Sequence, residues 1–495
     1  MTRFPVLLCL LLWGSVGLCN NILVKEIVLK DVNTAAGTMS VQVDVAWENS
    51  WRIEGGAFNH DAAWVFLKYM VRGDEWRHAS LTGVARTPAG STVEVAGDGK
   101  GAMIYMAASG GTAVSYNDLE LTWDYAGDGL SAADTERVAV RVFAVEMVYV
   151  PQNLFELGGA GTEGQRFYRV DANSSLRDPY TVSSEAAIAI GSAVGELYYE
   201  AGGQSGDRAG TLPADFPKGF ASFYAMKYEV SQQQYVDFYN TLTASQQAAL
   251  DLTGPTNKNS TAEVNRNAIS LQEEEGSIAS TVLPDLPVNY VRGVQALAFL
   301  DWAALRPMTE LEFEKLCRGP IGAQANEYAW GSSGIYTDEY VISSAGTPNE
   351  AVANADRNGV GVANAVYAAT VATSTSTPGP LRNGIFANGT EDFNRSETGG
   401  SFYGLMELSG NLGELVVTAG TATGRAFTGG HGDGTLTASG THDVAGWPAT
   451  AAGLGSRGGS YGDPTARLAV ADRATAASYD AAIQYNGLRG VRTLN

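Results

Sequence analysis

The feature that most constrains the fold is a change of pattern near residue 145. Before that point, apolar residues alternate with polar ones in short segments, as Val41, Val43 and Val45 do. Stretches rich in Gly, Asn and Asp separate these segments. Because short alternating runs between turns are typical of two-layer β structure, residues 21–145 are predicted to form an all-β, immunoglobulin-like sandwich of about seven strands.

After residue 145 the chain is rich in Gly, Thr, Ser and Ala, and helix signals are few. Ser231 with Gln234 has the spacing of a capping box, and so has Thr309 with Glu312. On the second predicted helix, Cys317 lies on the apolar stripe, which favours a small buried side chain over a reactive thiol. Residues 146–495 are therefore predicted to form a separate, irregular α+β domain.

Composition limits the partners of the chain. Its 495 residues include 32 Lys plus Arg against 53 Asp plus Glu, a formal net charge of -21. This sign excludes a general nucleic-acid binder and disfavours an anionic membrane surface. Three cysteines do not build a disulfide scaffold, and four scattered histidines leave little for a three-histidine metal centre.

Residues 1–20 have the order of a secretory signal peptide. Arg3 precedes an apolar run from Val6 to Trp13, and small and polar residues follow. The run is too short to span a bilayer, and the alternative is a buried N-terminal strand. We predict a secreted protein, periplasmic, at the cell surface or extracellular, with no transmembrane segment in its mature form.

Several segments of the second domain carry a further signal. In chain order they are MVYVP with FELG (147–158), MKYEVS (226–231), PV with RPMTELEFEKLCRG (287–319), YAWG (328–331), GLMELSGNLGEL (404–415), RGGSY (457–461) and GLR (487–489). Together they resemble the formylglycine-generating enzyme (sulfatase-modifying factor) family. The resemblance covers residues 146–495 and implies an irregular C-type-lectin-like fold, held by loops and bound calcium.

Family members with oxidase activity use a cysteine pair soon after the GGSY element, and that pair binds copper(I). This chain has no cysteine after Cys317, and Asp463 and Leu468 stand near the expected positions. Neither side chain binds copper(I) as a thiolate does. We therefore predict no copper cofactor, no catalytic residues of the family type and no oxidase activity.

The resemblance also implies calcium as a structural cofactor. Calcium takes several oxygen ligands, mixing carboxylates with backbone carbonyls. The segment ELSGNLGE offers both, because its two end glutamates bracket a turn that contains glycine. The alternative is that these glutamates are exposed and solvated. The predicted metal ligands are Glu407, Gly410, Leu412 and Glu414 at one site, and Asn354 and Ala355 at a second.

Arginines gather near the end of this acidic chain and predict a place for an anion or a glycan. Their alternative role is structural, bridging carboxylates and loop carbonyls. Gly413 stands where the family has a tryptophan, which implies a rebuilt or open pocket wall. The predicted ligand-binding residues are Ser460, Arg467, Arg473 and Arg489.

These observations favour a secreted, catalytically inactive family member, stabilised by calcium, that binds an unidentified protein or glycan. A structural part of a cell-surface assembly, with the sandwich as its docking piece, is the next interpretation. The alternative is a catalytic function instead of a binding function. In that case the protein is an enzyme of the same family that modifies a protein or a small thiol with altered active-site residues.

Overall fold

The computed structural model of the protein describes most of the chain after residue 21. The described ranges are 22–173, 177–272, 278–356, 362–371, 378–387 and 394–494. The predicted secretory signal, residues 1–20, therefore lies outside the described residues. Within these ranges, no helix is both long and apolar enough to cross a membrane.

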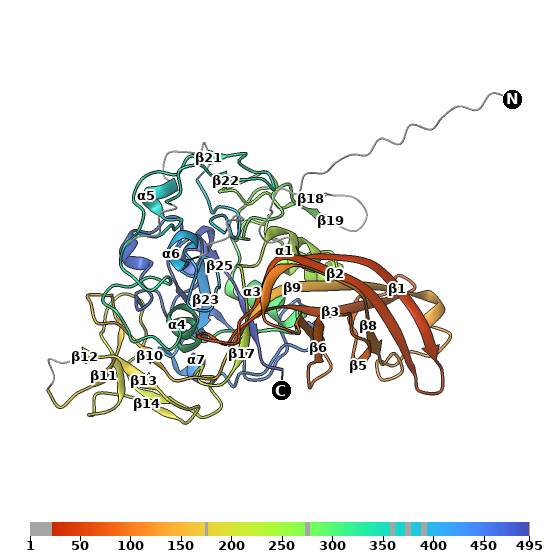
Figure 1. Ribbon diagram of the computed structural model, residues 1–495, viewed down its shortest axis with the longest axis horizontal. Helices are drawn as coiled ribbons and strands as arrows, with labels where there is room; N and C mark the ends of the chain where they lie inside the picture. Colours follow the sequence, from red (N-terminus) through yellow and green to blue (C-terminus); the bar gives the residue numbers. More distant parts are fainter. Residues whose placement is uncertain are drawn as a thin grey trace.

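The first part of the chain folds into two β-sheets packed face to face (Figure 1). One sheet has four strands in the order β1 (Leu23–Asn33), β2 (Thr38–Arg52), β8 (Gly110–Trp123) and β5 (Leu81–Arg86). Every second side chain of β2 from Met39 to Trp47 is buried in the layer between the sheets. The predicted alternation is thus present in this strand, whereas the immunoglobulin-like topology stays a prediction.

The second sheet has eight strands and continues into the rest of the molecule. Its order is β20 (Arg306–Pro307), β26 (Gly490–Arg492), β17 (Phe223–Met226), β9 (Val138–Val150), β3 (Asp61–Val71), β7 (Ala102–Met106) and β6 (Ser91–Val95), with β4 (Arg77–His78) paired to β3. Strand β9 pairs with β3 along most of its length and with β17 through its last four residues. The boundary predicted near residue 145 falls inside this strand, so the two predicted domains share one sheet.

Strand β3 shows why the two parts are joined in this way. Its residues 61–69 are all buried, because both faces of the strand are covered. Val65 lies in the layer between the two sheets, whereas Phe66 faces the helices on the other side. The Phe66 ring meets Trp302 of α3 (Gly293–Trp302) edge-on, with ring centroids 5.2 Å apart. An apolar run without alternation fits such a doubly covered strand.

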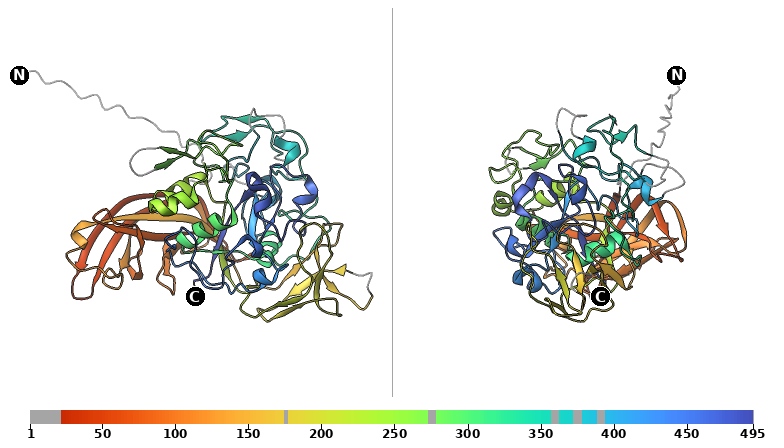
Figure 2. Two further views of the ribbon diagram at one scale, coloured as in Figure 1. Left: turned by 180° about the vertical axis from the view of Figure 1, so that it is seen from behind. Right: turned by 90° about the vertical axis from the view of Figure 1, so that its left-hand side faces the viewer.

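The remaining helices and strands are short, and long loops join them. The helices are α1 (Gln232–Tyr239), α2 (Ala244–Leu250), α4 (Glu310–Arg318), α5 (Ala368–Val371), α6 (Arg395–Thr398) and α7 (Ala422–Arg425), with 3-10 turns at Thr135–Arg137, Ala451–Gly453, Thr465–Arg467 and Asp480–Tyr485. A five-stranded sheet has the order β12 (Arg177–Asp178), β11 (Phe167–Val170), β15 (Leu197–Tyr199), β14 (Ile188–Ile190) and β16 (Gly210–Leu212). Figures 1 and 2 show this sheet and the N-terminal sheets at opposite ends of the molecule.

The smaller sheets complete the fold. They are β10 (Phe155–Leu157) with β13 (Tyr180–Val182), β18 (Ser270–Gln272) with β19 (Ile278–Ser280), β21 (Ile342–Ser343) with β22 (Ala351–Val352), and β24 (Leu454–Arg457), β23 (Gly413–Val417) and β25 (Asn486–Gly487) in that order. The last of these lies between the two ends of the molecule and carries part of the candidate site (Figure 1).

Two helices begin at the predicted capping boxes. The Oγ of Ser231 accepts the N–H of Gln234 at 3.2 Å, and the Gln234 side chain accepts the N–H of Ser231 at 2.9 Å. Thr309 and Glu312 form the same reciprocal pair at the start of α4. Cys317, on that helix, is fully buried. These local predictions are confirmed.

Candidate functional site

Glu407 and Glu414, two of the predicted calcium ligands, are buried in the structure. Glu414 lies on β23, and β24 and β25 cover the two edges of that strand. Glu407 lies in the tight turn before it and has a positive φ of 58°. Gly410, in the same turn, has φ +97°, and a Cβ there would lie 2.5 Å from the carbonyl oxygen of Val366. The alternative of two exposed, solvated glutamates is therefore wrong.

The fold brings a third carboxylate, Glu229, to these two, and sequence reasoning missed it. Its Oε1 accepts the N–H of Leu412 at 2.9 Å, and its Oε2 accepts a hydrogen bond from Nδ2 of Asn411 at 2.6 Å. Burial raises the pKa of Glu229 well above its ordinary value, and the charges of Glu414 and Glu407 raise it further. Its sequence signal was a single glutamate in the segment MKYEVS. We call Glu229, Glu407 and Glu414 the buried glutamate cluster.

Arg489 supplies a positive charge in contact with the buried glutamate cluster. Its Nε and Nη2 both donate to Oε1 of Glu414, at 3.0 and 2.7 Å. Its Nη1 donates to the backbone carbonyls of Met226 and Lys227, and Nη2 also reaches the carbonyl of Met406. All three guanidinium nitrogens are thus engaged inside the protein, and Arg489 is fully buried.

Buried oxygens of the kind that calcium prefers lie at and beside the cluster without hydrogen-bond partners among the described residues. Oε2 of Glu407, Oε2 of Glu414 and Oδ1 of Asn383 are buried and have no hydrogen-bond partner among the described residues. Burial raises the pKa of Glu407 to about 7, against the opposing pull of Arg489 and of the N–H of Gly384. Unpartnered buried carboxylate oxygens are costly, and a cation that prefers oxygen ligands would satisfy them. Two further predicted ligands, Gly410 and Leu412, lie on the turn that joins the two glutamates.

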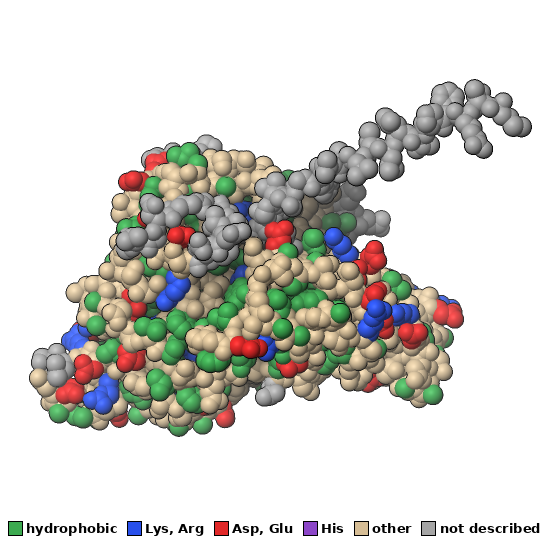
Figure 3. Space-filling model, in the orientation of Figure 1, with side chains coloured by type: hydrophobic (Ala, Val, Ile, Leu, Met, Phe, Trp, Pro, Cys, Tyr) green, Lys and Arg blue, Asp and Glu red, His purple; other side chains and the backbone are tan. Residues whose placement is uncertain are grey.

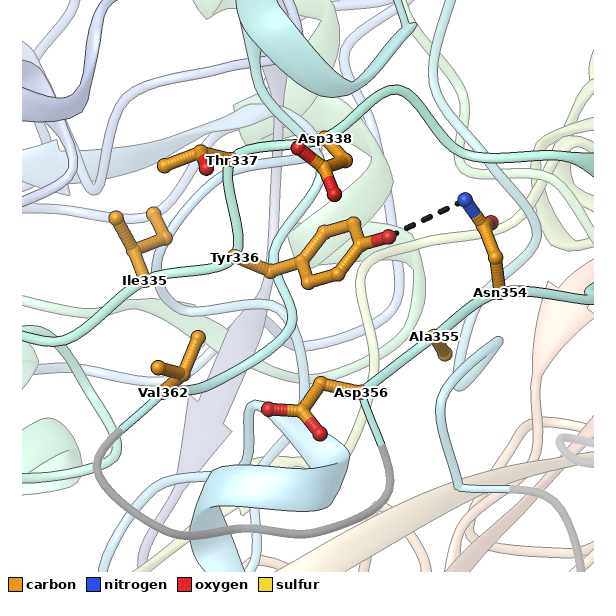
Figure 4. A pocket seen from close by; sticks show the side chains of 8 residues that line it. All are labelled: Ile335, Tyr336, Thr337, Asp338, Asn354, Ala355, Asp356 and Val362. Atoms are coloured by element: carbon orange, nitrogen blue, oxygen red, sulfur yellow. Dashed lines mark hydrogen bonds between the residues drawn. The ribbon is translucent and has the colours of Figure 1, made fainter.

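Asn354 and Ala355, the other predicted calcium pair, line a separate open cavity of about 560 Å³. Figure 4 shows Asp338 and Asp356 on either side of the Tyr336 ring, with Asn354 facing its hydroxyl. The Asn354 Oδ1 accepts a backbone N–H of the preceding loop at 2.7 Å, and its Nδ2 donates to the Tyr336 hydroxyl at 3.2 Å. Asn354 therefore already holds this loop together, and its oxygen keeps one lone pair for another partner.

A second cavity lies beside the GGSY segment and has a volume of about 110 Å³. Asp463, Arg467 and Gly413 are among the residues that line it. Ser460 is buried next to it, where its Oγ donates to Oδ2 of Asp463 at 2.7 Å. A Cβ at Gly413 would lie 2.4 Å from Oγ of Ser456, so a larger side chain there would displace that serine. Gly413, where an open pocket wall was expected, thus lines a small polar cavity.

The structure does not bring the four predicted ligand residues to one surface. Arg473 is fully buried, with its guanidinium 3.9 Å from the ring centres of Phe167 and Tyr199. Its Nε donates to Oε2 of Glu310 at 2.7 Å. Arg473 and Arg489 therefore have the structural role that was the alternative interpretation. Arg467 is partly exposed and pairs with Asp472 at 3.4 Å.

The residues around the GGSY cavity do not fit copper(I). Copper(I) selects soft thiolate ligands. Cys317 is a free, buried cysteine on α4, packed among apolar side chains, and burial raises the pKa of its thiol. Leu468, at one position where the resemblance places a thiol, is fully buried and apolar. Among the described residues that line this cavity, the side chains offer carboxylate, guanidinium, hydroxyl and amide groups instead.

A second acidic group, Asp301, Asp433 and Asp443, lies apart from the predicted sites. The buried Asp301 carboxylate accepts the N–H groups of Asp433 at 3.0 Å and of Asp443 at 3.2 Å. Buried Lys68 donates from Nζ to the carbonyl of Gly434 at 2.6 Å, and burial lowers the pKa of its ammonium group well below the ordinary value. Burial, and then the charge of Asp433, raises the pKa of Asp301 to about 7.

We expect Asp301→Asn to flatten the pH dependence of stability between about pH 4 and about pH 7. The folded pKa of about 7 lies above the ordinary value of 3.8, so the folded chain holds a proton that the unfolded chain releases. The wild-type protein therefore loses stability as pH rises through this window. Melting temperatures across the window measure the effect. The control Asp74→Asn, at an exposed position, should keep the wild-type slope of melting temperature against pH. A wild-type slope in the Asp301→Asn variant would contradict the prediction.

Comparison with known proteins gives one match. A family model described as the sulfatase-modifying factor enzyme 1-like domain matches residues 182–494. The match begins at the last residue of β13 and extends past β26. It includes β17, β20 and β26 of the eight-stranded sheet, whereas the other strands of that sheet and the whole four-stranded sheet lie outside it. No curated protein matches the chain.

Proposed function

The chain belongs to the sulfatase-modifying factor family, and from that membership we propose that it is a secreted, calcium-stabilised protein that binds a ligand and does not oxidise cysteine. The ligand is a protein or a glycan recognised at the surface of the family domain. An enzyme of the same family with altered active-site residues is the alternative.

The observation that carries the proposal is the chemistry beside the GGSY segment. Asp463 is locked by two hydrogen bonds from Ser460, one from its Oγ and one from its N–H at 3.0 Å. Leu468 is buried, and Cys317 does not line the cavity. A cavity with a carboxylate, a guanidinium and hydroxyls suits hydrogen bonding to a polar group, whereas copper-dependent oxidation needs two thiolates.

Calcium has a structural role in this proposal. The ligands would be the unpartnered oxygens of Glu407 and Glu414, with backbone carbonyls of Gly410 and Leu412 and the Asn383 side chain as further donors. The ion would neutralise charge that Arg489 alone leaves unbalanced, and it would hold the turn before β23 against the strand. The cavity at Asn354 is the candidate for a second ion.

A role in a surface assembly is favoured by the shared sheet. Strand β9 belongs both to the two packed sheets and, through β17, to the family domain. The orientation of the N-terminal part is therefore fixed relative to the family domain. A part held in this way is better suited to docking than one on a flexible tether. Co-purification of the protein with isolated cell envelopes, compared with its recovery from the medium, would distinguish assembly from free ligand binding.

We expect no formylglycine when the purified protein is incubated with a sulfatase-type CxPxR peptide, copper and oxygen. The reason is the absence of a thiolate pair to hold copper(I). Mass spectrometry of the peptide measures the conversion of its cysteine. The double variant Asp463→Cys with Leu468→Cys, folded as judged by its melting curve, tests whether the missing thiols account for the result. Measurable conversion by the wild-type protein would contradict the proposal.

A further inference from the structure

Four aromatic rings form a row across neighbouring strands where the N-terminal sheets meet the family domain. Tyr149 of β9 lies directly opposite Tyr224 of β17 in the strand register. On the other side of β9, the N–H of Tyr149 donates to the carbonyl of His60, the residue before β3. Tyr105 of β7 follows Ile104, which lies opposite Ala63 of β3. Because side chains of a strand alternate between its faces, these four rings lie on one face of the shared sheet.

The rings contact one another. His60 stacks on Tyr105 with centroids 4.3 Å apart, and on Tyr149 with centroids 5.0 Å apart. Its Nε2 lies 3.1 Å from the Tyr224 hydroxyl, within hydrogen-bond distance. The guanidinium of Arg52 lies 5.4 Å from the centre of the Tyr105 ring. The position of each ring is thus set by its neighbours, which is the rigidity that a binding site needs.

These rings line a cavity of about 370 Å³. Its other lining residues are mostly polar or charged and come from both parts of the chain: Arg52, Glu94, Ser222, Phe223, Thr493 and Leu494. The Tyr105 hydroxyl contacts both Glu94 and Arg52. The cavity therefore combines aromatic walls with one cation, one anion and several hydroxyl groups, and it shares no lining residue with the GGSY cavity.

We propose that this cavity at the junction of the two parts binds a sugar ring. A pyranose presents apolar C–H groups that pack on aromatic walls, and hydroxyls that each donate and accept hydrogen bonds. Tyrosine hydroxyls and serine supply groups of both kinds, Arg52 donates only, and ionised Glu94 accepts only. A volume of about 370 Å³ is within the range of small-molecule sites and accommodates one or two such rings.

Other ligand classes match this lining less well. A purely apolar ligand would remove the charged groups of Arg52 and Glu94 from water without offering either a new hydrogen bond, at a cost in free energy for each group. A divalent cation would find one carboxylate, that of Glu94, among the lining residues, and an adjacent guanidinium that repels it. The site is independent of the proposed calcium ion and remains even if the GGSY cavity binds nothing.

The test uses saturation-transfer NMR on the full-length folded protein, with glucose, glucuronic acid and phenol as separate probes at millimolar concentration. We expect transfer to both sugars, and tighter binding of glucuronic acid because Arg52 can pair with its carboxylate. Glu94→Gln and Tyr149→Phe should each weaken sugar binding by about fivefold to tenfold. Arg77→Ala, an exposed position on β4, is the control and should leave the affinity unchanged.

The possible outcomes decide the proposal. Loss of affinity in both cavity variants, with melting temperatures equal to that of the wild type, would support it. Transfer to phenol without transfer to either sugar would overturn it, because the cavity would then be an aromatic site only. No transfer to any probe, or sugar binding that both variants leave unchanged, would overturn it as well.

Discussion

Replacing Glu310 with alanine should lower the free energy of unfolding by about 3–5 kcal/mol, because it leaves buried arginines without their carboxylate. Glu310 begins α4 and is fully buried. Its Oε2 accepts hydrogen bonds from Arg457 at 3.0 Å and from Arg473 at 2.7 Å. Its Oε1 accepts from Arg473 at 3.0 Å and from the hydroxyl of Thr418 at 2.8 Å.

The electrostatics of Glu310 explain why the effect should be large. Burial is the largest single influence and acts to raise the pKa of Glu310, but the charges of Arg473 and Arg457 and the hydrogen bonds to Glu310 together outweigh it, and the net pKa is lowered. Without Glu310, Arg457 keeps Glu314 at 2.7 Å, whereas Arg473 keeps backbone carbonyls and two aromatic rings. The unpaired charge of Arg473 should therefore dominate the loss of stability.

Urea unfolding followed by circular dichroism measures this loss. Glu310→Gln keeps the size and part of the hydrogen bonding, so its loss should be smaller than that of the alanine variant. Glu136→Ala, at an exposed position, is the matched control and should change stability by less than about 0.5 kcal/mol. A Glu310→Ala midpoint indistinguishable from that of Glu136→Ala would show that the buried pairs contribute nothing net.

The Glu310 interactions also show which part of the structure was predictable from the sequence. The capping box of Thr309 and Glu312 and the burial of Cys317 depend on residues one to four positions apart, so local spacing predicted them. The pairing of Arg473 with Glu310 joins residues 163 positions apart. No local pattern carries such a pair, and the same arginine could therefore be interpreted as a ligand-binding residue.

The shared sheet was not predicted, although its signal was present. Strand β9 reads VAVRVFAVEMVYV without a turn residue, and dividing it at residue 145 cut a continuous strand. The resemblance to a family began just after that point and suggested a boundary at a position where strand β9 is continuous. Strand β9 pairs with β3 on one edge and, through its last four residues, with β17 on the other, so its place in the sheet depends on contacts with both parts.

The arrangement of the buried glutamate cluster was predictable in part. The motif positioned Glu407 and Glu414 at one site, and both are buried together. Glu229 escaped because it lies 178 and 185 positions before them, and only the fold shows that its charge acts on theirs. The family resemblance identified the turn, and the three-dimensional arrangement added the third carboxylate and the arginine.

Removing calcium with EDTA should lower the melting temperature, and restoring calcium should recover it. At calcium concentrations about a hundred times the dissociation constant, the ion would add about 3 kcal/mol to the free energy of unfolding. The expected reason is that the calcium ion gives a partner to Oε2 of Glu407 and Oε2 of Glu414, which are buried and have no hydrogen bond among the described residues. Scanning calorimetry with and without calcium measures the shift, and elemental analysis of the purified protein measures bound metal.

Variants of the cluster separate a calcium site from a general effect of salt. Glu407→Gln keeps the shape of the side chain and removes one charge, so it should abolish most of the calcium-dependent shift while the protein stays folded. Glu397→Gln, on α6 outside the cluster, should respond to calcium as the wild type does. Magnesium at equal concentration should stabilise less, because it demands a compact octahedral shell that a buried cluster built from three long side chains does not readily form. An unchanged melting temperature in EDTA, together with no calcium in the purified protein, would contradict the prediction. The cluster would then be neutralised by protons, in agreement with the raised pKa values of Glu229 and Glu407.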